Sequence, residues 1–240
     1  MNDSVREHKN QHSKYRLKRQ SLPEALADSL RERILNGEFK EGEPLVQEAI
    51  AAEYDCSRMP VREAFRQLEA AGLIVSRIHK GAIVTSLPAE QIIELFELRA
   101  MLECDILKHS LACLSDEDLA RSEKILEELE NAYHRRDKEK AGALNWEFHR
   151  SLYFTAPRTQ TLALIQGINV QTERYRRLCP LFMCGLQEAE QEHRQILAMF
   201  KIRDTDVLQL MRDHIIRTGH RLVEGLVQRD EQVETKLQSR

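Results

Sequence analysis

Histidines on three separate predicted helices are the residues of this sequence with the clearest chemical potential. His149 lies one turn after Asn145 in a helix predicted over about 138–155, and His193 and His214 belong to two later helices. Each shares a helix face with apolar residues, so the helical period points three imidazoles into one interior. One buried histidine is usually a hydrogen-bonded core residue, but three are costly to bury without a partner. A divalent metal satisfies them, because neutral imidazole suits Zn, Ni, Mn or Fe and leaves positions open for an anionic ligand.

A second group of residues, nearer the N-terminus, carries positive charge at helical spacing. Arg58, Arg62 and Arg66 recur every fourth residue after Ser57, a residue type that begins helices, and Pro60 is tolerated in a first turn. The three guanidinium groups therefore form one stripe along a helix. Such a stripe is often only a solvated surface. However, a short helix that packs on one face and carries arginines on the neighbouring face suits the DNA major groove.

The elements around the arginine stripe follow the order of a winged helix-turn-helix domain. A capping box at Ser21 begins a helix that stops at Gly37, and a second helix is predicted over about 45–54. Two strands, at 73–77 and 82–85, follow the arginine-bearing helix and are rich in Ile and Val. Three helices and a hairpin thus place the arginines on the third helix, the position that reads DNA.

The region from about residue 21 to 86 resembles the N-terminal domain of GntR-type bacterial transcription regulators. The resemblance rests on four segments, namely residues 36–42, 57–64, 68–74 and 80–84. It implies that Arg58 and Arg62 touch DNA, that Ser57 lies near phosphate and that the wing residue Gly81 enters the minor groove. Arg66 and Lys80 join them from geometry.

Two residues depart from the pattern of this family. Glu48 stands where many relatives carry Arg, so that DNA contact is expected to be missing. Met59 replaces the commoner Thr, which removes a hydroxyl donor and alters the expected base preference. The predicted DNA-binding set is Ser57, Arg58, Met59, Arg62, Arg66, Lys80 and Gly81.

Beyond Pro88 the pattern changes to long amphipathic helices. Six are predicted, at about 89–111, 115–135, 138–155, 159–178, 185–202 and 205–229, with short connections typical of an antiparallel bundle. The chain is therefore expected to be mainly α. Its expected parts are a basic flexible tail (1–20), the winged helix-turn-helix domain (21–86), a linker (87–91), an all-α antiparallel helical bundle for effector, metal and dimer contacts (92–230) and a flexible tail (231–240).

The bundle resembles the ligand-binding domain of the FadR-type subgroup of GntR regulators, the FCD domain, over about residues 92–230. The matching motifs are 145–149 (NWEFH), 192–194 (EHR) and 214–215 (HI). The resemblance implies that Asn145, His149, His193 and His214 bind one divalent metal per chain, which coordinates a small carboxylate effector. Relatives often carry Asp at position 145, whereas Asn offers an uncharged oxygen, so metal binding is expected to be looser or the histidines to hold an anion directly.

Arg99 is a further candidate for effector binding. It shares a helix face with apolar residues, so its guanidinium requires an anion. Either Glu103, one turn later, neutralises it as a structural ion pair, or its planar fork holds the carboxylate of the effector. In the run 173–177 the charged residues are expected to lie mainly on the surface, with room for one arginine to turn inward.

Composition narrows the classes of protein that remain. The chain has 240 residues, 42% of them hydrophobic, and a net charge of −3, so DNA affinity would depend on locally focused charge. No apolar run approaches the roughly 18 residues of a membrane span and no signal peptide is visible, which predicts a cytoplasmic protein without membrane contact. Five scattered cysteines lack CxxC spacing and are expected to be reduced.

The expected function is sequence-specific DNA binding by a homodimeric transcription regulator, with repression as the favoured mode. A small carboxylate effector, held through the metal in the bundle, would modulate binding to double-stranded operator DNA. Two alternatives stay open: a constitutive regulator without an effector, and a metal-dependent helical-bundle enzyme. The enzyme is disfavoured because no Ser-His-Asp set, phosphate loop or dinucleotide motif is present and only His193 follows a Glu at the diiron spacing. The sequence identifies neither the effector nor the operator.

Overall fold

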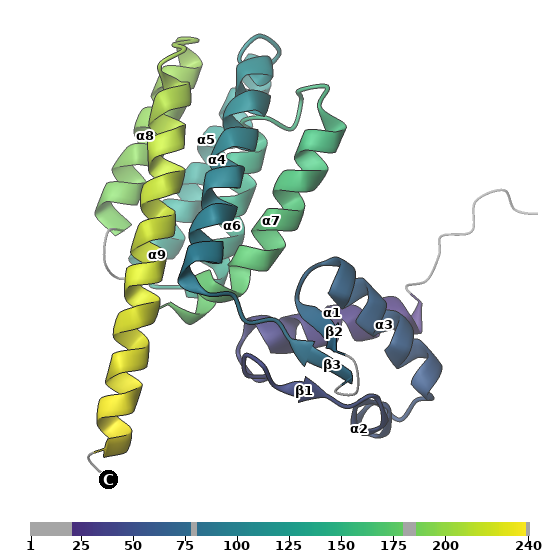
Figure 1. Ribbon diagram of the computed structural model, residues 1–240. Coiled ribbons are helices and arrows are strands. Elements are labelled where there is room, and N and C mark those ends of the chain that lie inside the picture. Colours follow the sequence, from purple (N-terminus) through teal and green to yellow (C-terminus); the bar gives the residue numbers. More distant parts are fainter. Residues whose placement is uncertain (1–20, 78–80, 180–185, 239–240) are drawn as a thin grey trace, which may run out of the picture.

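A computed structural model of the chain describes residues 21–77, 81–179 and 186–238. It contains a small N-terminal domain of helices and short strands and a larger bundle of long helices (Figure 1). The expected fold class, mainly α with a winged helix-turn-helix domain ahead of a helical bundle, is therefore confirmed. The basic tail at 1–20, with its predicted flexibility, lies outside the described residues.

The N-terminal domain contains three helices and three short strands. They are α1 (Leu22–Leu35), β1 (Pro44–Leu45), α2 (Gln47–Glu53), α3 (Arg58–Ala70), β2 (Ile74–Arg77) and β3 (Gly81–Val84). Helix α1 begins at the predicted capping box, in which the side chains of Ser21 and Glu24 each accept from the other's backbone N–H. Its apolar face packs on α3 around a core of buried side chains: Leu26, Leu30, Ile34, Val61, Phe65 and Leu68.

The strands form one antiparallel sheet in the order β1-β3-β2. The hairpin of β2 and β3 was predicted, whereas β1 was not, because two residues give no periodic pattern. Pro44 and Leu45 pair with Ile83 and Ala82, so α2 begins later than expected from the sequence. The first residue of β3, Gly81, pairs with Arg77 and thereby fixes the two ends of the wing.

Over the described residues 87–179 and 186–238, the bundle contains the six expected helices. They are α4 (Ala89–Ser110), α5 (Asp116–His134), α6 (Lys138–Ser151), α7 (Thr159–Leu178), α8 (Leu186–Lys201) and α9 (Val207–Gln238). None of the helices in the described part of the chain is long and apolar enough to cross a membrane.

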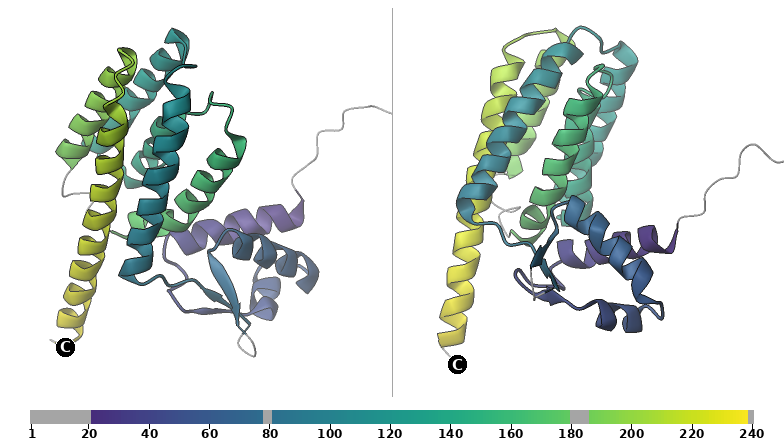
Figure 2. Two further views of the ribbon diagram at one scale, coloured as in Figure 1. Left: turned by 45° about the horizontal axis from the view of Figure 1, so that its top comes forward. Right: turned by 45° about the vertical axis from the view of Figure 1, so that its right-hand side comes forward.

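Helix α9 is longer than predicted. The predicted end lies near residue 229 with a flexible tail over 231–240, but the helix continues to Gln238 and extends past the rest of the bundle (Figures 1 and 2). The physical reason is that no Gly or Pro follows Gly225, so nothing in the sequence breaks the helix.

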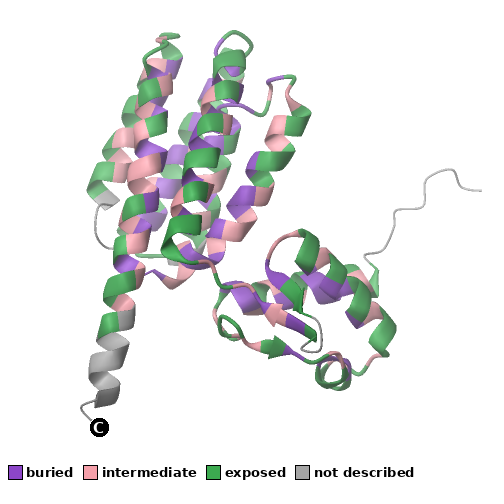
Figure 3. Cartoon of the chain, viewed as in Figure 1, coloured by how far each residue is buried: buried purple, intermediate pink, exposed green. Residues whose placement is uncertain are grey.

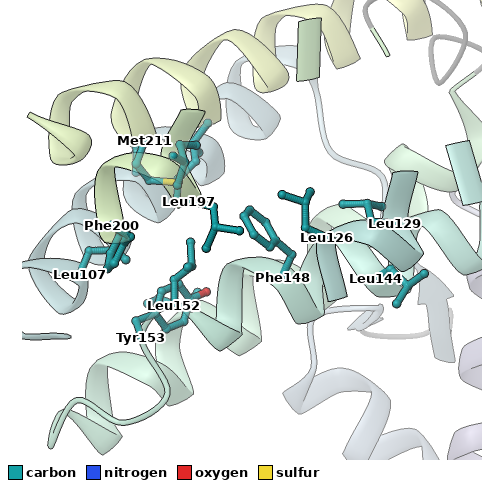
Figure 4. Packing of buried hydrophobic residues seen from close by; sticks show 14 of the residues in the cluster. Leu107, Leu126, Leu129, Leu144, Phe148, Leu152, Tyr153, Leu197, Phe200 and Met211 are labelled. Carbon is teal, nitrogen blue, oxygen red and sulfur yellow. The ribbon is translucent and has the colours of Figure 1, made fainter. Parts of the chain in front are cut away.

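The core of the bundle is built from aromatic and branched side chains contributed by most of its helices. Figure 4 shows the packing of this core, which includes Leu107, Leu126, Phe148, Leu152, Tyr153, Leu197, Phe200 and Met211. Helices α4 and α9 approach closely because Gly219 has no side chain: a Cβ there would lie 2.7 Å from Cγ of Phe96. Buried residues collect on the inner faces of the helices, whereas much of α3 is exposed (Figure 3).

The two domains meet at the C-terminal end of α7, which packs against α1. Arg177 Nη1 donates to Glu32 Oε2 at 2.8 Å and to Asn36 Oδ1 at 3.0 Å. Arg174 Nη2 donates to the carbonyl oxygen of Phe39 at 3.0 Å. One helix of the bundle therefore supplies direct polar contacts to the winged domain.

Candidate functional site

The three predicted histidines meet in the interior of the bundle. His149 of α6, His193 of α8 and His214 of α9 are 1%, 0% and 3% exposed. Each offers one ring nitrogen within 4.8 Å of those of the other two. The packing of the three helices thus brings together residues as far apart in the sequence as His149 and His214, which are separated by 65 positions.

Two carboxylates orient two of the imidazoles. His149 Nδ1 lies 2.9 Å from Glu103 Oε2, and His214 Nδ1 lies 2.6 Å from Glu192 Oε2. An ionised carboxylate can only accept a hydrogen bond, so the Nδ1 that faces it carries the hydrogen in both rings, and in the neutral ring each Nε2 is left with its lone pair. This carboxylate–histidine pairing is the arrangement that fixes the tautomer of metal ligands. This role of Glu103 and Glu192 was not predicted from the sequence.

The arrangement of the Nε2 atoms fits a divalent cation. His193 Nε2 and His214 Nε2 are 3.2 Å apart, close to the separation of about 3.4 Å that tetrahedral zinc imposes on two nitrogens at about 2.0–2.1 Å. His149 Nε2 is buried and has no hydrogen-bond partner among the described residues. Burial lowers the pKa of His149 to about 4 and the pKa of His193 well below its ordinary value, so both rings are neutral and able to coordinate. The residues present therefore suit a metal.

Asn145 lies beside the histidines, as its position one turn before His149 predicts. Its Nδ2 is 3.3 Å from His193 Nε2, and its side chain is hydrogen-bonded to that of the buried Tyr133 on α5. Because the two ends of an amide have nearly the same shape, a 180° turn of the side chain places Oδ1 where Nδ2 stands. Asn145 is thus within reach of the same centre, and its neighbour Tyr133 was not predicted from the sequence.

Arg99 makes the ion pair that was one of its two predicted roles, and it does so next to the histidines. Arg99 and Glu103 are 2% and 0% exposed and paired through Nε and Oε1. Arg99 Nη2 is also 3.2 Å from His149 Nδ1. Although burial alone would raise the pKa of Glu103, Arg99 and His149 lower it to about 2. Glu103 is therefore a permanent anion that joins the arginine to a histidine.

The charged run in α7 contains one further arginine that is buried, Arg174, and one that is partly buried, Arg176. Arg174 is 3% exposed at the junction with the winged domain. Arg176 Nη2 donates to Asn169 Oδ1 at 2.7 Å, and its Nε is buried. Burial and the nearby charge of Arg99 lower the pKa of Arg176 to about 10. The sequence predicted that one arginine of this run could turn inward, but its pattern did not identify which one.

The predicted DNA-reading residues lie on the exposed side of α3. Met59 is 63% exposed, and the side chains of Arg58 and Arg66 are each 66% exposed. Arg58 is paired with Glu48 of α2, Arg66 Nη1 lies 3.3 Å from Glu63 Oε2, and Arg62 Nη2 donates to Met59 Sδ at 3.0 Å.

The helix start and the wing complete this surface. Ser57 is the N-cap of α3, and its exposed hydroxyl makes no capping hydrogen bond, which leaves the hydroxyl available to a phosphate. Gly81 has φ of +71° at the wing, a conformation that favours glycine. Lys80, the other predicted wing residue, lies outside the described residues.

Comparisons with known families match both domains. Residues 22–84 match the family of bacterial regulatory proteins named gntR, and residues 94–217 match the FCD domain. The second match alone spans more than half of the chain.

Individual relatives and structures agree with this assignment. The chain is 32% identical over 143 residues to the uncharacterized HTH-type transcriptional regulator YdhC of Bacillus subtilis, a match to 59% of this chain and 64% of that protein. It is 24% identical over 204 residues to the gluconate operon transcriptional repressor of Bacillus licheniformis, which covers 85% of this chain and 83% of the repressor. The solved structure of Escherichia coli McbR/YncC shares the fold, with a TM-score of 0.71, 21% identity, and coverage of 85% and 97%.

Proposed function

The chain belongs to the GntR family of bacterial transcription regulators and carries an FCD domain, and we propose that it is a repressor whose operator binding responds to a small carboxylate bound in the bundle. DNA binding and transcription regulation follow from the family. The effector, its attachment through a divalent metal, the dimer and action in the bacterial cytoplasm are the proposal. Its main support is the convergence of three buried imidazoles, two of them oriented by carboxylates.

The metal would be held by His149, His193 and His214, with Asn145 as a fourth, uncharged ligand. Zn, Ni, Mn and Fe all suit this set of donors. When bound, such a metal acts as a Lewis acid that anchors a carboxylate. Glu103 and Glu192 keep the Nδ1 protons in place, so that the Nε2 lone pairs face the centre.

The DNA would be read by α3 and the wing. Arg58 and Arg62 would donate to base edges in the major groove, and Met59 would make an apolar contact with a base. Ser57 and Arg66 would contact phosphate. Lys80 and Gly81 would approach the minor groove. The exposed ion pair of Arg58 with Glu48 is worth at most about 1 kcal/mol, so DNA can displace the glutamate at little cost.

Two copies would pair through the bundle. Three apolar side chains of the neighbouring helices α4 and α7 are exposed, Leu98 at 41%, Met101 at 59% and Leu164 at 59%. Exposed apolar side chains on adjoining helices are typical of a surface that a partner covers. A symmetric dimer would present two α3 helices to two half-sites of an operator.

Coupling between effector and DNA would pass through α7. This helix contacts the winged domain through Arg174 and Arg177, and Tyr175 accepts a hydrogen bond from the backbone of Leu87 in the linker. Arg174 makes only one hydrogen bond there, and its Nε and Nη1 have no partner among the described residues. A buried charge without its full set of hydrogen bonds makes the docked arrangement of the two domains less stable, so a small free energy from effector binding is enough to change it.

The packing at the junction also leaves room for movement. A cavity of about 130 Å³ lies between the linker, the end of α7 and α9, lined by Glu41, Leu87, Tyr175, Leu226, Arg229 and four other residues. Close-packed interiors transmit strain, whereas side chains that border a partly open pocket have fewer packing contacts to oppose a small shift. A coupling free energy of about 1–3 kcal/mol is sufficient for regulation.

Metal analysis and DNA binding together test this proposal. Protein purified without a His tag or chelator is expected to contain about one Zn, Ni or Mn per chain by mass spectrometry. A DNA sequence selected from a random pool by this protein is expected to be bound less tightly after addition of an effective carboxylate. A protein that stays empty on metal titration would defeat the metal assignment, and operator affinity that no carboxylate changes would favour a constitutive regulator.

A further inference from the structure

An acidic side chain lies among the arginines of the predicted DNA-reading surface. Glu48, in the first turn of α2, is paired through Oε1 with Nη1 of Arg58, in the first turn of α3. The two side chains are 60% and 66% exposed. Arg62 and Arg66 instead contact residues three positions earlier on α3 itself. Arg58 is therefore the one of these three arginines that is paired with a residue of a second helix.

The carboxylate of Glu48 needs a hydrogen-bond donor when DNA binds. Once Arg58 turns to a base edge, the ion pair opens and Glu48 faces the DNA as an anion that can only accept. Phosphates are negatively charged and offer no donor, so they repel this carboxylate. Residues 21–86 contain eight Lys or Arg and eleven Asp or Glu, so the domain has no surplus of positive charge to offset the repulsion.

The donors that DNA presents in its major groove are the amino groups of cytosine and adenine. Cytosine presents its N4 amino group without an acceptor on the same base edge, whereas adenine places the N7 lone pair beside its N6 amino group. Because a carboxylate is an acceptor only, N7 of adenine repels it. Cytosine is therefore the base that Glu48 matches best.

The position of Glu48 allows it to reach a base next to the one that Arg58 reads. Adjacent base pairs are about 3.4 Å apart along the DNA axis, and the hydrogen-bonded ends of Glu48 and Arg58 lie within that distance of each other. Helices α2 and α3 pack together, which keeps the two side chains on one surface. Small changes of rotamer would therefore move the partners onto neighbouring base pairs.

We propose that Glu48 is a specificity-determining residue whose carboxylate accepts from N4 of a cytosine, in the base pair next to the guanine that Arg58 reads. This proposal rests on the proposed function, because it requires α3 to lie in the major groove. DNA would then exchange one ion pair of the free protein for two base contacts. The acid on this surface would select a sequence instead of only weakening the binding of all sequences.

Sequences selected by the full-length protein from a random DNA pool test the proposal, with fluorescence anisotropy on single-base variants of the selected site. The unchanged protein is expected to prefer one cytosine in each half-site about ten-fold over the other bases. Glu48→Gln is expected to change the preference at that position to adenine, because a glutamine amide bonds both N6 and N7 of adenine. Glu48→Ala is expected to lose the preference, and Arg58→Ala is expected to lose the guanine beside it.

Glu63→Gln is the matched control for the loss of charge. Glu63 lies on α3, where its Oε2 is 3.3 Å from Nη1 of Arg66, and its side chain is 51% exposed. Both glutamine variants are expected to bind random DNA more tightly than the unchanged protein, because each removes an anion that repels phosphate. Glu63→Gln is expected to keep the selected sequence, so a change seen only with Glu48→Gln reports base reading rather than charge.

The outcomes separate this inference from the function on which it rests. If Arg62→Ala abolishes binding to the selected DNA while both Glu48 variants keep every base preference, the role of Glu48 is overturned and DNA reading by α3 stands. If the unchanged protein selects no sequence, DNA reading by α3 is itself overturned, and the role of Glu48 with it. The exposed position of Glu48 makes its variants compatible with the fold.

Discussion

Arg176 and Arg177 are consecutive residues of α7, yet Arg176 hydrogen-bonds Asn169 in the bundle while Arg177 reaches Glu32 of the winged domain. Two consecutive residues of one helix therefore make one contact within the bundle and one with the winged domain. Because a helix moves as a rigid element, a shift of α7 at Arg176 must displace the contacts of Arg177. This relationship makes the end of α7 the place to test how the two domains communicate.

Arg177→Gln is expected to loosen the docking of the winged domain. The change removes the ion pair with Glu32, a contact worth about 1 kcal/mol or less on a partly exposed surface. A glutamate-specific protease should then cut faster at Glu90, which lies where the linker enters α4. Glu32→Gln should have the same effect, and Arg31→Gln, whose partner Asp28 lies within α1, should have none. Equal cutting rates in all four proteins would refute a role for Arg177 in docking.

Arg62→Ala is expected to abolish sequence-specific DNA binding while the fold and the dimer persist. Loss of a bidentate base contact costs about 1–3 kcal/mol at each half-site, and a dimer loses two. Fluorescence anisotropy with DNA selected by the unchanged protein measures the effect. Arg31→Ala, which removes an arginine from α1, serves as the charge-matched control. Unchanged affinity of the Arg62 variant for the selected DNA would defeat the assignment of α3 as the reading helix.

The sequence predicted the histidine cluster because its pattern is strong. Each imidazole recurs with apolar residues at helical spacing, so the inward direction follows from periodicity without knowledge of the packing. Glu103 was predicted only as a counter-ion of Arg99, and the pairing of Glu103 with His149 and of Glu192 with His214 was not predicted, because an acidic residue next to a histidine is also common on surfaces. Their roles depend on which helices become neighbours, and that is a property of the tertiary fold.

The end of α7 is a segment in which helical periodicity does not predict which side chains are buried. The run 173–177 is charged or aromatic on every side, so no apolar face tells which arginine turns inward. In the structure, Arg174 is buried against Phe39 of the winged domain, whereas Arg176 is partly buried and donates to Asn169 two turns earlier on the same helix. Strand β1 was missed for a similar reason, because its two residues are defined by pairing with β3.

His193→Ala is expected to remove the metal while leaving DNA binding in the absence of effector unchanged. The change removes one of the three converging ring nitrogens, and the two histidines that remain are too few ligands to hold a metal stably. Metal content per chain is the readout, with selected DNA as the test of the N-terminal domain. His109→Ala removes an exposed imidazole from α4 and is the control. Full metal content in the His193 variant would rule out this residue as a ligand.

Glu103→Gln is expected to destabilise the bundle and weaken metal binding together. It leaves the buried guanidinium of Arg99 without its counter-charge, which costs about 3–5 kcal/mol. The amide also keeps a single acceptor oxygen where the carboxylate has two, so Arg99 and His149 compete for it. Loss of an orienting partner typically lowers metal affinity about 10–100-fold. The readouts are denaturant unfolding and metal titration.

The double variant Arg99→Met, Glu103→Leu separates these two effects. Replacing both charges with apolar groups of similar size should restore most of the stability, because no unpaired charge remains. Metal affinity should stay low, because His149 still lacks its carboxylate. Recovery of metal affinity in the double variant would show that Glu103 acts through stability alone.

The stability of the metal-free protein is expected to fall as the pH is lowered from 7.5 to 5.5. An unfolded imidazole takes up a proton below about 6.5, whereas burial lowers the pKa of His149 to about 4 in the folded chain. Below 6.5 the unfolded state therefore binds a proton that the folded state does not, and the free energy of unfolding decreases by about 1 kcal/mol for this residue by pH 5.5. Denaturant unfolding of chelator-treated protein at several pH values gives the slope. His149→Gln, whose amide can still donate to Glu103, should flatten that slope, and an identical slope in both proteins would contradict the low pKa of His149.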